Sequence, residues 1–258
     1  MPCFAGMPTN LPGRPSPRLL VLDVLGTLVD HDDAVRRALA AAFQAHGEHV
    51  DPDVAGMCLG HPGATGIERL MKWLHPREEP HRESCKSIHD LAVKELTRLV
   101  RFGGEMQVVA GVEKLLEVWT STGRRVAATS TLHPTIVRAL MERLGWDRRP
   151  PFEALVLAEE VARPTPGPDM ILECMRRVGV TDVAEVAKVA NSAIGLADAK
   201  ALGCGWCVLL DRGGLTTDQI AAIAPTAIVD RVEDLGLLWR SKPTDGRLER
   251  EIQRVLGR

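Results

Sequence analysis

The chain contains no tyrosine, and only nine of its 258 residues are aromatic, namely five Trp and four Phe. Without a phenol, mechanisms that use tyrosine as a nucleophile, an acid or a hydrogen-bond donor are excluded. The same scarcity argues against an aromatic platform on which the bases of single-stranded nucleic acid would stack. The remaining composition, with 45% hydrophobic and 26% charged residues, is typical of a globular protein with a sizeable core.

An excess of positive charge is also missing, since the formal net charge is −2 at pH 7. The sequence therefore predicts neither nucleic acid nor an anionic membrane as a partner. The basic residues are 25 Arg and only 7 Lys, so lysine chemistry has few candidates. No apolar run reaches the ~18–20 residues of a membrane span. Residues 1–17 hold five prolines and no apolar signal-peptide core. We expect a disordered leader over residues 1–17 and a cytoplasmic protein.

Cysteine and histidine indicate no metal or disulfide framework. Six cysteines are spread thinly over the chain, unlike those of a small secreted domain. Cys204 and Cys207 have CxxC spacing, but no second pair completes a zinc site. We interpret them as small residues at a junction between a helix and a strand. The eight histidines show no paired metal spacing.

Apolar patterning predicts the fold class. Buried strands are predicted over residues 18–23, 125–129, 152–157, 186–190, 206–210 and 227–229. Helices are predicted between them over residues 111–119, 134–144, 168–178 and 194–202, with a capping box at Asp230 and Glu233 opening another. Strands that alternate with helices favour a doubly wound parallel, Rossmann-like sheet.

Residues 32–103 break this alternation, because they carry helical spacing and no β-rich run. We therefore predict an α/β core domain over residues 18–31 and 104–240, with an all-helical cap domain over residues 32–103 inserted after the first strand. Residues 241–258 are predicted to form a C-terminal helix that could pack on a second copy of the chain, so a homo-oligomer is compatible with the sequence.

Polar side chains follow the predicted strands at the edge where open α/β sheets bind ligands. Asp23 ends the first strand, Thr129 ends the second, Arg163 follows the third, and Asn191 follows the fourth. A carboxylate can attack a substrate, a hydroxyl can hold an oxyanion, and a cation can neutralise charge or orient the nucleophile. These residues predict a site for an anionic or polarised small molecule.

The combination resembles the haloacid dehalogenase-like superfamily, over a stretch from about Arg18 to Trp239. Asp23-Val-Leu-Gly-Thr-Leu is similar to its first motif, Asp-x-Asp-Gly-Thr-Leu, and Thr129 to its second. Arg163-Pro-Thr-Pro stands where the family has Lys-Pro-x-Pro, and Asn191-Ser-Ala-Ile-Gly195 where it has Asp-Ser/Thr-x-x-Asp. The resemblance implies that Asp23 is the nucleophile, that it forms a covalent aspartyl intermediate, and that the helical insertion is the cap.

Three departures from the family motifs concern protons and metal. Leu25 replaces the second Asp that phosphatase members use as general acid and base. Asn191 and Gly195 replace the two acids of the fourth motif, which removes charged oxygen ligands from a hard dication. We predict no metal site and no cofactor, with at most weak magnesium binding. Asp198, about one helical turn past Gly195, is the carboxylate that could stand in.

Two subfamilies tolerate part of this pattern. Phosphonoacetaldehyde hydrolases also have a non-acidic residue at the Leu25 position and Arg-Pro at the third motif, but Met57 stands where their cap lysine would be. L-2-haloacid dehalogenases act without metal, and their fourth-motif region is similar to Ala190-Asn-Ser and to Ala199-Lys-Ala. They have tyrosine at the Leu25 position and lysine at the Arg163 position, and this chain has neither there.

The leading hypothesis is a hydrolase that is independent of metal or only weakly dependent on it. Asp23 would form an aspartyl ester on a small organic acid or a phosphonate-like molecule, with Thr129 and Arg163 as the other catalytic residues. His61 is a candidate base for water. The residues expected to contact the substrate are Leu25, Gly26, Thr27, Ser130, Met57, His61 and Asn191.

Two alternatives remain open. The first is a non-catalytic or repurposed member of the superfamily that binds a metabolite or a partner protein. The second is a magnesium-dependent phosphatase rescued by Asp198 and Asn191. The sequence does not name the substrate, because the cap side chains that select it cannot be placed from the sequence.

Overall fold

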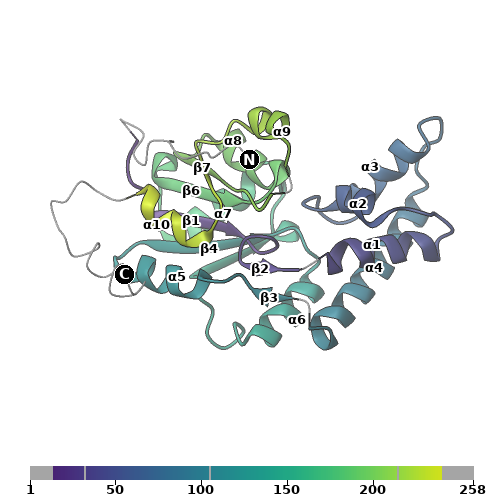
Figure 1. Cartoon of the computed structure of the whole chain (residues 1–258), viewed down its shortest axis with the longest axis horizontal. Helices are drawn as coiled ribbons and strands as arrows, with labels where there is room; N and C mark the ends of the chain where they lie inside the picture. The colour runs from purple at the N-terminus through teal and green to yellow at the C-terminus, as the bar shows by residue number, and fades with distance from the viewer. Residues whose placement is uncertain (1–13, 32, 105, 214, 240–258) are drawn as a thin grey trace.

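A six-stranded parallel sheet forms the centre of the larger lobe in the computed structural model, which describes residues 14–31, 33–104, 106–213 and 215–239 (Figure 1). The strand order is β5-β4-β1-β6-β7-β8, and each neighbouring pair is parallel. The strands are β1 (Leu19–Asp23), β4 (Arg125–Ser130), β5 (Ala154–Leu157), β6 (Val186–Ala190), β7 (Trp206–Leu210) and β8 (Ala227–Val229). The predicted fold class is confirmed.

The central strands are apolar along their length because both faces of the sheet are covered. Leu20 and Leu22 of β1 point into one hydrophobic cluster, whereas Leu19 and Val21 point into the cluster on the opposite face. The helices of this lobe are α5 (Val112–Ser121), α6 (Pro134–Leu144), α7 (Asp169–Val178), α8 (Ala193–Leu202), α9 (Thr217–Ile223) and α10 (Leu235–Leu238). The register pairs Asp23 with Thr129, which brings two predicted site residues to one edge of the sheet.

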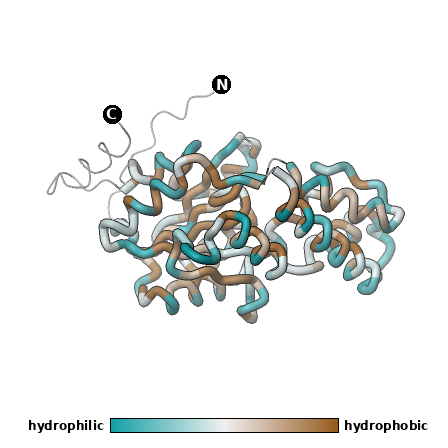
Figure 2. The backbone as a smooth tube through the Cα atoms, turned by 90° about the horizontal axis from the view of Figure 1, so that it is seen from below, coloured by the Kyte–Doolittle hydropathy of each residue, from teal (hydrophilic) through white to brown (hydrophobic). Residues whose placement is uncertain are grey.

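The second lobe is helical and lies beyond that edge (Figure 1). Its helices are α1 (Ala34–Ala45), α2 (Pro52–Ala55), a 3-10 turn (Gly56–Cys58), α3 (Thr65–Leu74) and α4 (Arg82–Phe102). No strand occurs among its described residues, 33–104, as the sequence predicted. Figure 2 shows brown, apolar stretches inside both lobes and a narrow connection between them.

The connection contains a two-stranded ribbon that apolar patterning does not predict. Strands β2 (Val29–Asp30) and β3 (Gln107–Val108) pair in antiparallel fashion, one before and one after the helical lobe. With two residues each, they are too short to give an alternating pattern. This ribbon joins the two ends of the helical insertion at one place in the core.

The capping box was predicted at the wrong helix. Asp230 does not cap the turn that follows, Val232–Asp234, and the Glu233 carboxylate accepts a 2.9 Å hydrogen bond from Arg231 instead. A complete capping box opens α9, where Thr216 and Gln219 exchange hydrogen bonds. Apolar spacing does not predict this helix, because its seven residues are too few for a periodic pattern.

The predicted leader, residues 1–17, lies outside the described residues except for residues 14–17. The predicted C-terminal helix, residues 241–258, lies wholly outside them. Residues 14–17 are described and contact the core, since Trp206 Nε1 donates to the Pro15 carbonyl at 2.9 Å and Arg124 donates to Ser16 Oγ at 2.8 Å. Among the helices of the described ranges, none has the length and apolar character needed to span a membrane.

Candidate active site

Asp23 lies at the carboxyl end of β1 with its carboxylate held by two neighbouring strands. Thr129 of β4 donates a 2.9 Å hydrogen bond from Oγ1 to Asp23 Oδ1, and Lys188 of β6 donates to the same oxygen. The Lys188 ammonium also donates to Thr129 Oγ1 at 2.5 Å. Three adjacent strands thus bring a carboxylate, a hydroxyl and an ammonium together.

Lys188 is the cation of this site, and its side chain is fully buried. Asp198 of α8 is also fully buried and places Oδ2 3.9 Å from the ammonium. Burial by itself would lower the pKa of Lys188, but the carboxylates of Asp198 and Asp23 outweigh it and raise that pKa. The charged form of Lys188 is therefore favoured, and the ammonium lies between two carboxyl groups, of which burial raises the pKa of Asp198.

The structure does not bring Arg163 to Asp23, so the prediction of its position is corrected. Its side chain is 70% exposed and pairs with Asp169 at the start of α7, with Nη2 to Oδ1 at 2.8 Å. The hydrogen bond from Arg163 to Asp169 raises the pKa of the guanidinium. Because the Asp169 carboxylate also accepts from the Arg163 backbone N–H at 3.0 Å, the segment is fixed with the side chain turned outward.

One signal in the sequence could have revealed Lys188. It is a charged residue in the middle of the otherwise apolar strand Val186–Ala190, where a buried lysine needs a charged partner. Lys188 is paired with Val21 in the sheet register, two residues before Asp23.

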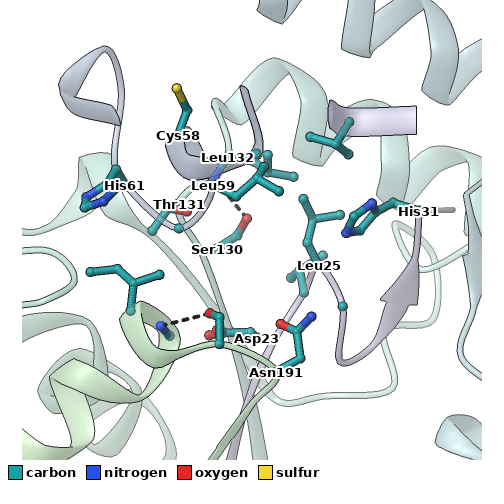
Figure 3. A pocket seen from close by; sticks show the side chains of 18 of the residues that line it. Asp23, Leu25, His31, Cys58, Leu59, His61, Ser130, Thr131, Leu132 and Asn191 are labelled. Carbon is teal, nitrogen blue, oxygen red and sulfur yellow. Dashed lines mark hydrogen bonds between the residues drawn. The ribbon is translucent and has the colours of Figure 1, made fainter. Parts of the chain in front are cut away.

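A cavity of about 850 Å³ lies over Asp23 and is lined by residues of both lobes. Figure 3 shows Asp23 below the cavity, with His61 and His31 on opposite sides above it. Of the predicted substrate-contact residues, those that line it are Leu25, Gly26, Met57, His61, Ser130 and Asn191. Thr27 is not among the lining residues; it is fully buried, and its Oγ1 has no hydrogen-bond partner in the described part of the chain.

Two glycines fix the walls around Asp23. Gly26 has a φ of +75°, and a Cβ there would lie 2.1 Å from Nδ2 of Asn191, so the amide occupies space that only glycine leaves. A Cβ at Gly195 would lie 2.3 Å from Asp23 Oδ2. With the Asp23 carboxylate where it lies here, any side chain at position 195 would displace Oδ2.

The side chains near Asp23 do not supply the set of charged oxygens that Mg²⁺ prefers. Leu25 is apolar, Asn191 is neutral, and Asp23 already shares an ammonium. Asp198 does not line the cavity and accepts a 3.1 Å hydrogen bond from Thr165. The described residues contain no cluster of three or more His, Cys, Asp or Glu arranged for a metal ion.

Burial disfavours the charged form of the two imidazoles labelled in Figure 3. Burial lowers the pKa of His31, although Asp30 and Asp33 oppose the shift. Burial also lowers the pKa of His61, and Arg69 adds to the effect. A neutral imidazole can accept a proton from water.

Cys204 and Cys207 lie where α8 ends and β7 begins, as interpreted from the sequence. Both thiols are free and buried. Burial raises the pKa of Cys204 to about 12, so it is not a reactive thiolate.

Comparison with known proteins places this geometry in a family. A family model described as "haloacid dehalogenase-like hydrolase" matches residues 17–203. The chain is 29% identical over 193 residues to the plasmid-encoded protein CbbY of Cupriavidus necator, which covers 71% of this chain and 74% of that protein. It is 32% identical over 129 residues to the probable phosphatase IndB of Dickeya dadantii, covering 50% and 54%.

Solved structures share the fold. CbbY from Rhodobacter sphaeroides, in complex with xylulose-1,5-bisphosphate, superposes with a TM-score of 0.69 at 24% identity, covering 83% of this chain and 94% of that one. A phosphonoacetaldehyde hydrolase-like protein from Oleispira antarctica gives a TM-score of 0.70 at 21% identity, covering 94% of each chain. At these identities the likeness establishes the arrangement of sheet and cap, and nothing about the substrate.

Proposed function

Because the chain belongs to the haloacid dehalogenase-like hydrolase family, we propose that it is a hydrolase with Asp23 as its nucleophile. A carboxylate oxygen of Asp23 bonds to carbon or phosphorus of the substrate, and the leaving group departs with the electron pair. Water then hydrolyses the aspartyl ester and regenerates the carboxylate. The substrate is a small organic acid or a phosphonate-like molecule.

One observation carries this proposal: Asp23 lies below the cavity with Oδ1 held by Thr129 and Lys188. Both hydrogen bonds fall on the same oxygen, so the carboxylate is oriented and we assign Oδ2 as the attacking atom. Lys188 takes the orienting role that the sequence analysis gave to Arg163. Its positive charge also stabilises negative charge that develops on the substrate next to Thr129.

Leu25 limits the leaving group. An apolar side chain at this position cannot protonate a departing alkoxide, so a poor leaving group would lack its acid. Substrates whose leaving group departs without a proton, such as a halide, suit the site. For the second step, His61 lines the cavity, burial favours its neutral form, and it is the base that we propose for water.

The reaction that we propose is independent of metal or only weakly dependent on it. The buried ammonium of Lys188 already supplies positive charge at the carboxylate that would otherwise bind Mg²⁺. Asn191 offers a neutral oxygen and Gly195 offers none, so a hard dication would find few charged ligands here.

Heavy-oxygen labelling tests the nucleophile. The protein is incubated in H₂¹⁸O with a panel of 2-haloalkanoic acids, phosphonoacetaldehyde and phosphomonoesters, and the peptide that contains Asp23 is analysed by mass spectrometry. With a 2-haloalkanoic acid we expect ¹⁸O in this peptide after turnover, since water attacks the carboxyl carbon of the aspartyl ester, and none in Asp23→Asn. With a phosphorus substrate water attacks phosphorus, so we expect the label in the released phosphate and a phosphorylated Asp23 peptide after a rapid acid quench. Turnover of a haloalkanoic acid without label in the peptide, or of a phosphorus substrate without the phosphorylated peptide, contradicts the proposal.

A non-catalytic role is the second candidate, and the identity of Leu25, Asn191 and Gly195 favours it. Such a protein would bind a metabolite or a partner in the same cavity. It would give no turnover with the whole panel, and Asp23→Asn would leave binding intact. A magnesium-dependent phosphatase ranks third, because it needs Asp198, which is buried and outside the cavity lining. Phosphatase activity that a chelator abolishes would revive it.

A further inference from the structure

The charged side chains that line the cavity are mostly acidic. Within the described residues, four aspartates and two arginines line it, namely Asp23, Asp30, Asp33, Asp211, Arg36 and Arg212. Lys188 is not among the lining residues, but it pairs with Asp23, which is. Above that pair, the described lining carries three aspartates against two arginines, so a second anionic group would meet no net positive charge.

Each arginine is already engaged by an acid. Arg36 of α1 places Nη1 2.6 Å from Asp33 Oδ1 and 3.7 Å from Asp53 Oδ1. Arg212, in the loop after β7, places Nη2 2.6 Å from Asp30 Oδ2. A ligand anion that bound to either guanidinium would have to compete with an aspartate that is part of the chain.

Four histidines line the cavity, namely His31, His61, His89 and His133. His133 Nδ1 accepts a 3.2 Å hydrogen bond from the Thr135 N–H, and His89 Nδ1 lies 3.6 Å from Asp90 Oδ1, so each of these two rings already has a partner in the chain. Burial lowers the pKa of His31, which faces Asp30, Asp33, Arg36 and Arg212. His61 is shifted in the same direction. Both rings can exchange hydrogen bonds with a neutral substrate body, but they do not offset the charge of a second phosphate.

From this charge pattern we infer that the substrate carries a single anionic group, bound over Thr129 and Lys188, and an uncharged body beneath the cap. The inference rests on the proposed function, in which the reacting group sits on Asp23. It excludes sugar bisphosphates of the kind bound by the Rhodobacter sphaeroides relative. Like charge opposite a ligand group costs affinity and selects against the wrong partner.

Paired probes that differ by one anionic group test the inference. The Asp23→Asn variant, which cannot form the aspartyl ester, is titrated by calorimetry with xylulose 5-phosphate and xylulose 1,5-bisphosphate, and with 2-chloropropionate and 2-chlorosuccinate. We expect the singly substituted member of a pair to bind at least as tightly as its partner. Tighter binding of the doubly substituted member, by about tenfold or more, overturns the inference, and so does failure of all four probes to bind.

A variant that should gain affinity for the doubly substituted probes tests whether the ion pair of Arg36 with Asp33 causes the preference. Asp33→Ala, added to Asp23→Asn, frees Arg36 from its shorter ion pair and should shift the affinity ratio toward the doubly substituted probes by about three- to tenfold. Glu142→Ala, on α6 and outside the cavity lining, changes the net charge by the same amount and serves as the control. An equal shift in both variants means that Arg36 is not the group concerned. Heavy-oxygen labelling is a separate measurement, so failure of the proposed chemistry and failure of this inference can be told apart.

Discussion

At the scale of single residues, Lys188 accounts for more of the site than any side chain singled out from the sequence. It holds Asp23 and Thr129, and it is the partner of the buried Asp198. Removing one member of a buried ion pair leaves the other charge without compensation, which costs more than the pair contributes. The site and the stability of the core therefore depend on the same ammonium.

We predict that Lys188→Met lowers the free energy of unfolding by about 3–5 kcal/mol, because Asp198 loses its counter-charge. It should also abolish ¹⁸O labelling of Asp23. Arg163→Met, which the sequence motif would rank as equally damaging, should retain labelling because the guanidinium is bonded to Asp169 at the surface. Urea unfolding and peptide mass spectrometry measure the two effects. Loss of labelling in Arg163→Met together with its retention in Lys188→Met would return the role to Arg163.

At the scale of elements, the sequence predicted most of the framework. Apolar runs predicted the six strands. Helix α6 begins at Pro134 and is capped by Gly145, as expected. Short elements were missed, because β2, β3 and α9 have too few residues for a periodic pattern. Lys188, the cation at Asp23, was also not predicted. The family motifs give only the order of residues along the chain, whereas the face to which a strand residue points depends on the register of the sheet.

The N-terminus of α8 is the element that places Gly195 beside Asp23. Ser192 caps it, with Oγ accepting from the Gly195 N–H at 3.2 Å. We predict that Ser192→Ala lowers the free energy of unfolding by about 1 kcal/mol and also slows turnover, because the first turn of α8 loses its anchor next to the nucleophile.

Thr216→Ala is the matched control, since Thr216 caps α9 in the same way and does not line the cavity. It should cost a similar amount of stability, about 1 kcal/mol, and leave turnover unchanged. Urea midpoints and initial rates of the two variants are compared side by side. Equal rates in both variants would show that the α8 cap has no bearing on the site.

At the scale of the whole molecule, the two lobes share one buried apolar cluster. It runs from Leu20 and Leu22 on the sheet to Phe43, Ile88 and Leu96 in the helical lobe. The cap is also tied to the core by Arg143 of α6, whose Nη1 donates to the Val100 carbonyl at 2.6 Å. The cavity, with its partly buried histidines, lies where the lobes meet, so charging those histidines affects the folded molecule as a unit.

Acid should therefore destabilise the protein in a defined window. Burial lowers the pKa of His31 and His61 in the folded state, whereas in the unfolded chain both titrate near about 6.5. As the pH falls below that value, the unfolded chain takes up protons that the folded chain does not. The free energy of unfolding consequently drops, and it stops dropping from this cause below the folded-state pKa values. Above about pH 7.5 these two groups contribute no slope.

The double variant His31→Gln, His61→Gln removes both groups and should flatten the dependence of stability on pH between about 7.5 and 5.5. His49→Gln, which changes an exposed histidine outside the cavity lining, is the control and should keep the slope of the parent chain. Urea unfolding at several pH values measures the dependence of stability on pH in the parent chain and in both variants. Glu173 acts at lower pH, because its hydrogen bonds to Arg176 and Arg177 lower its pKa to about 2. Its contribution is present above about pH 4.5 and is lost as the pH falls toward 2. A slope that persists in the double variant above pH 5.5 would mean that protonation at the junction of the lobes is not what acid acts on.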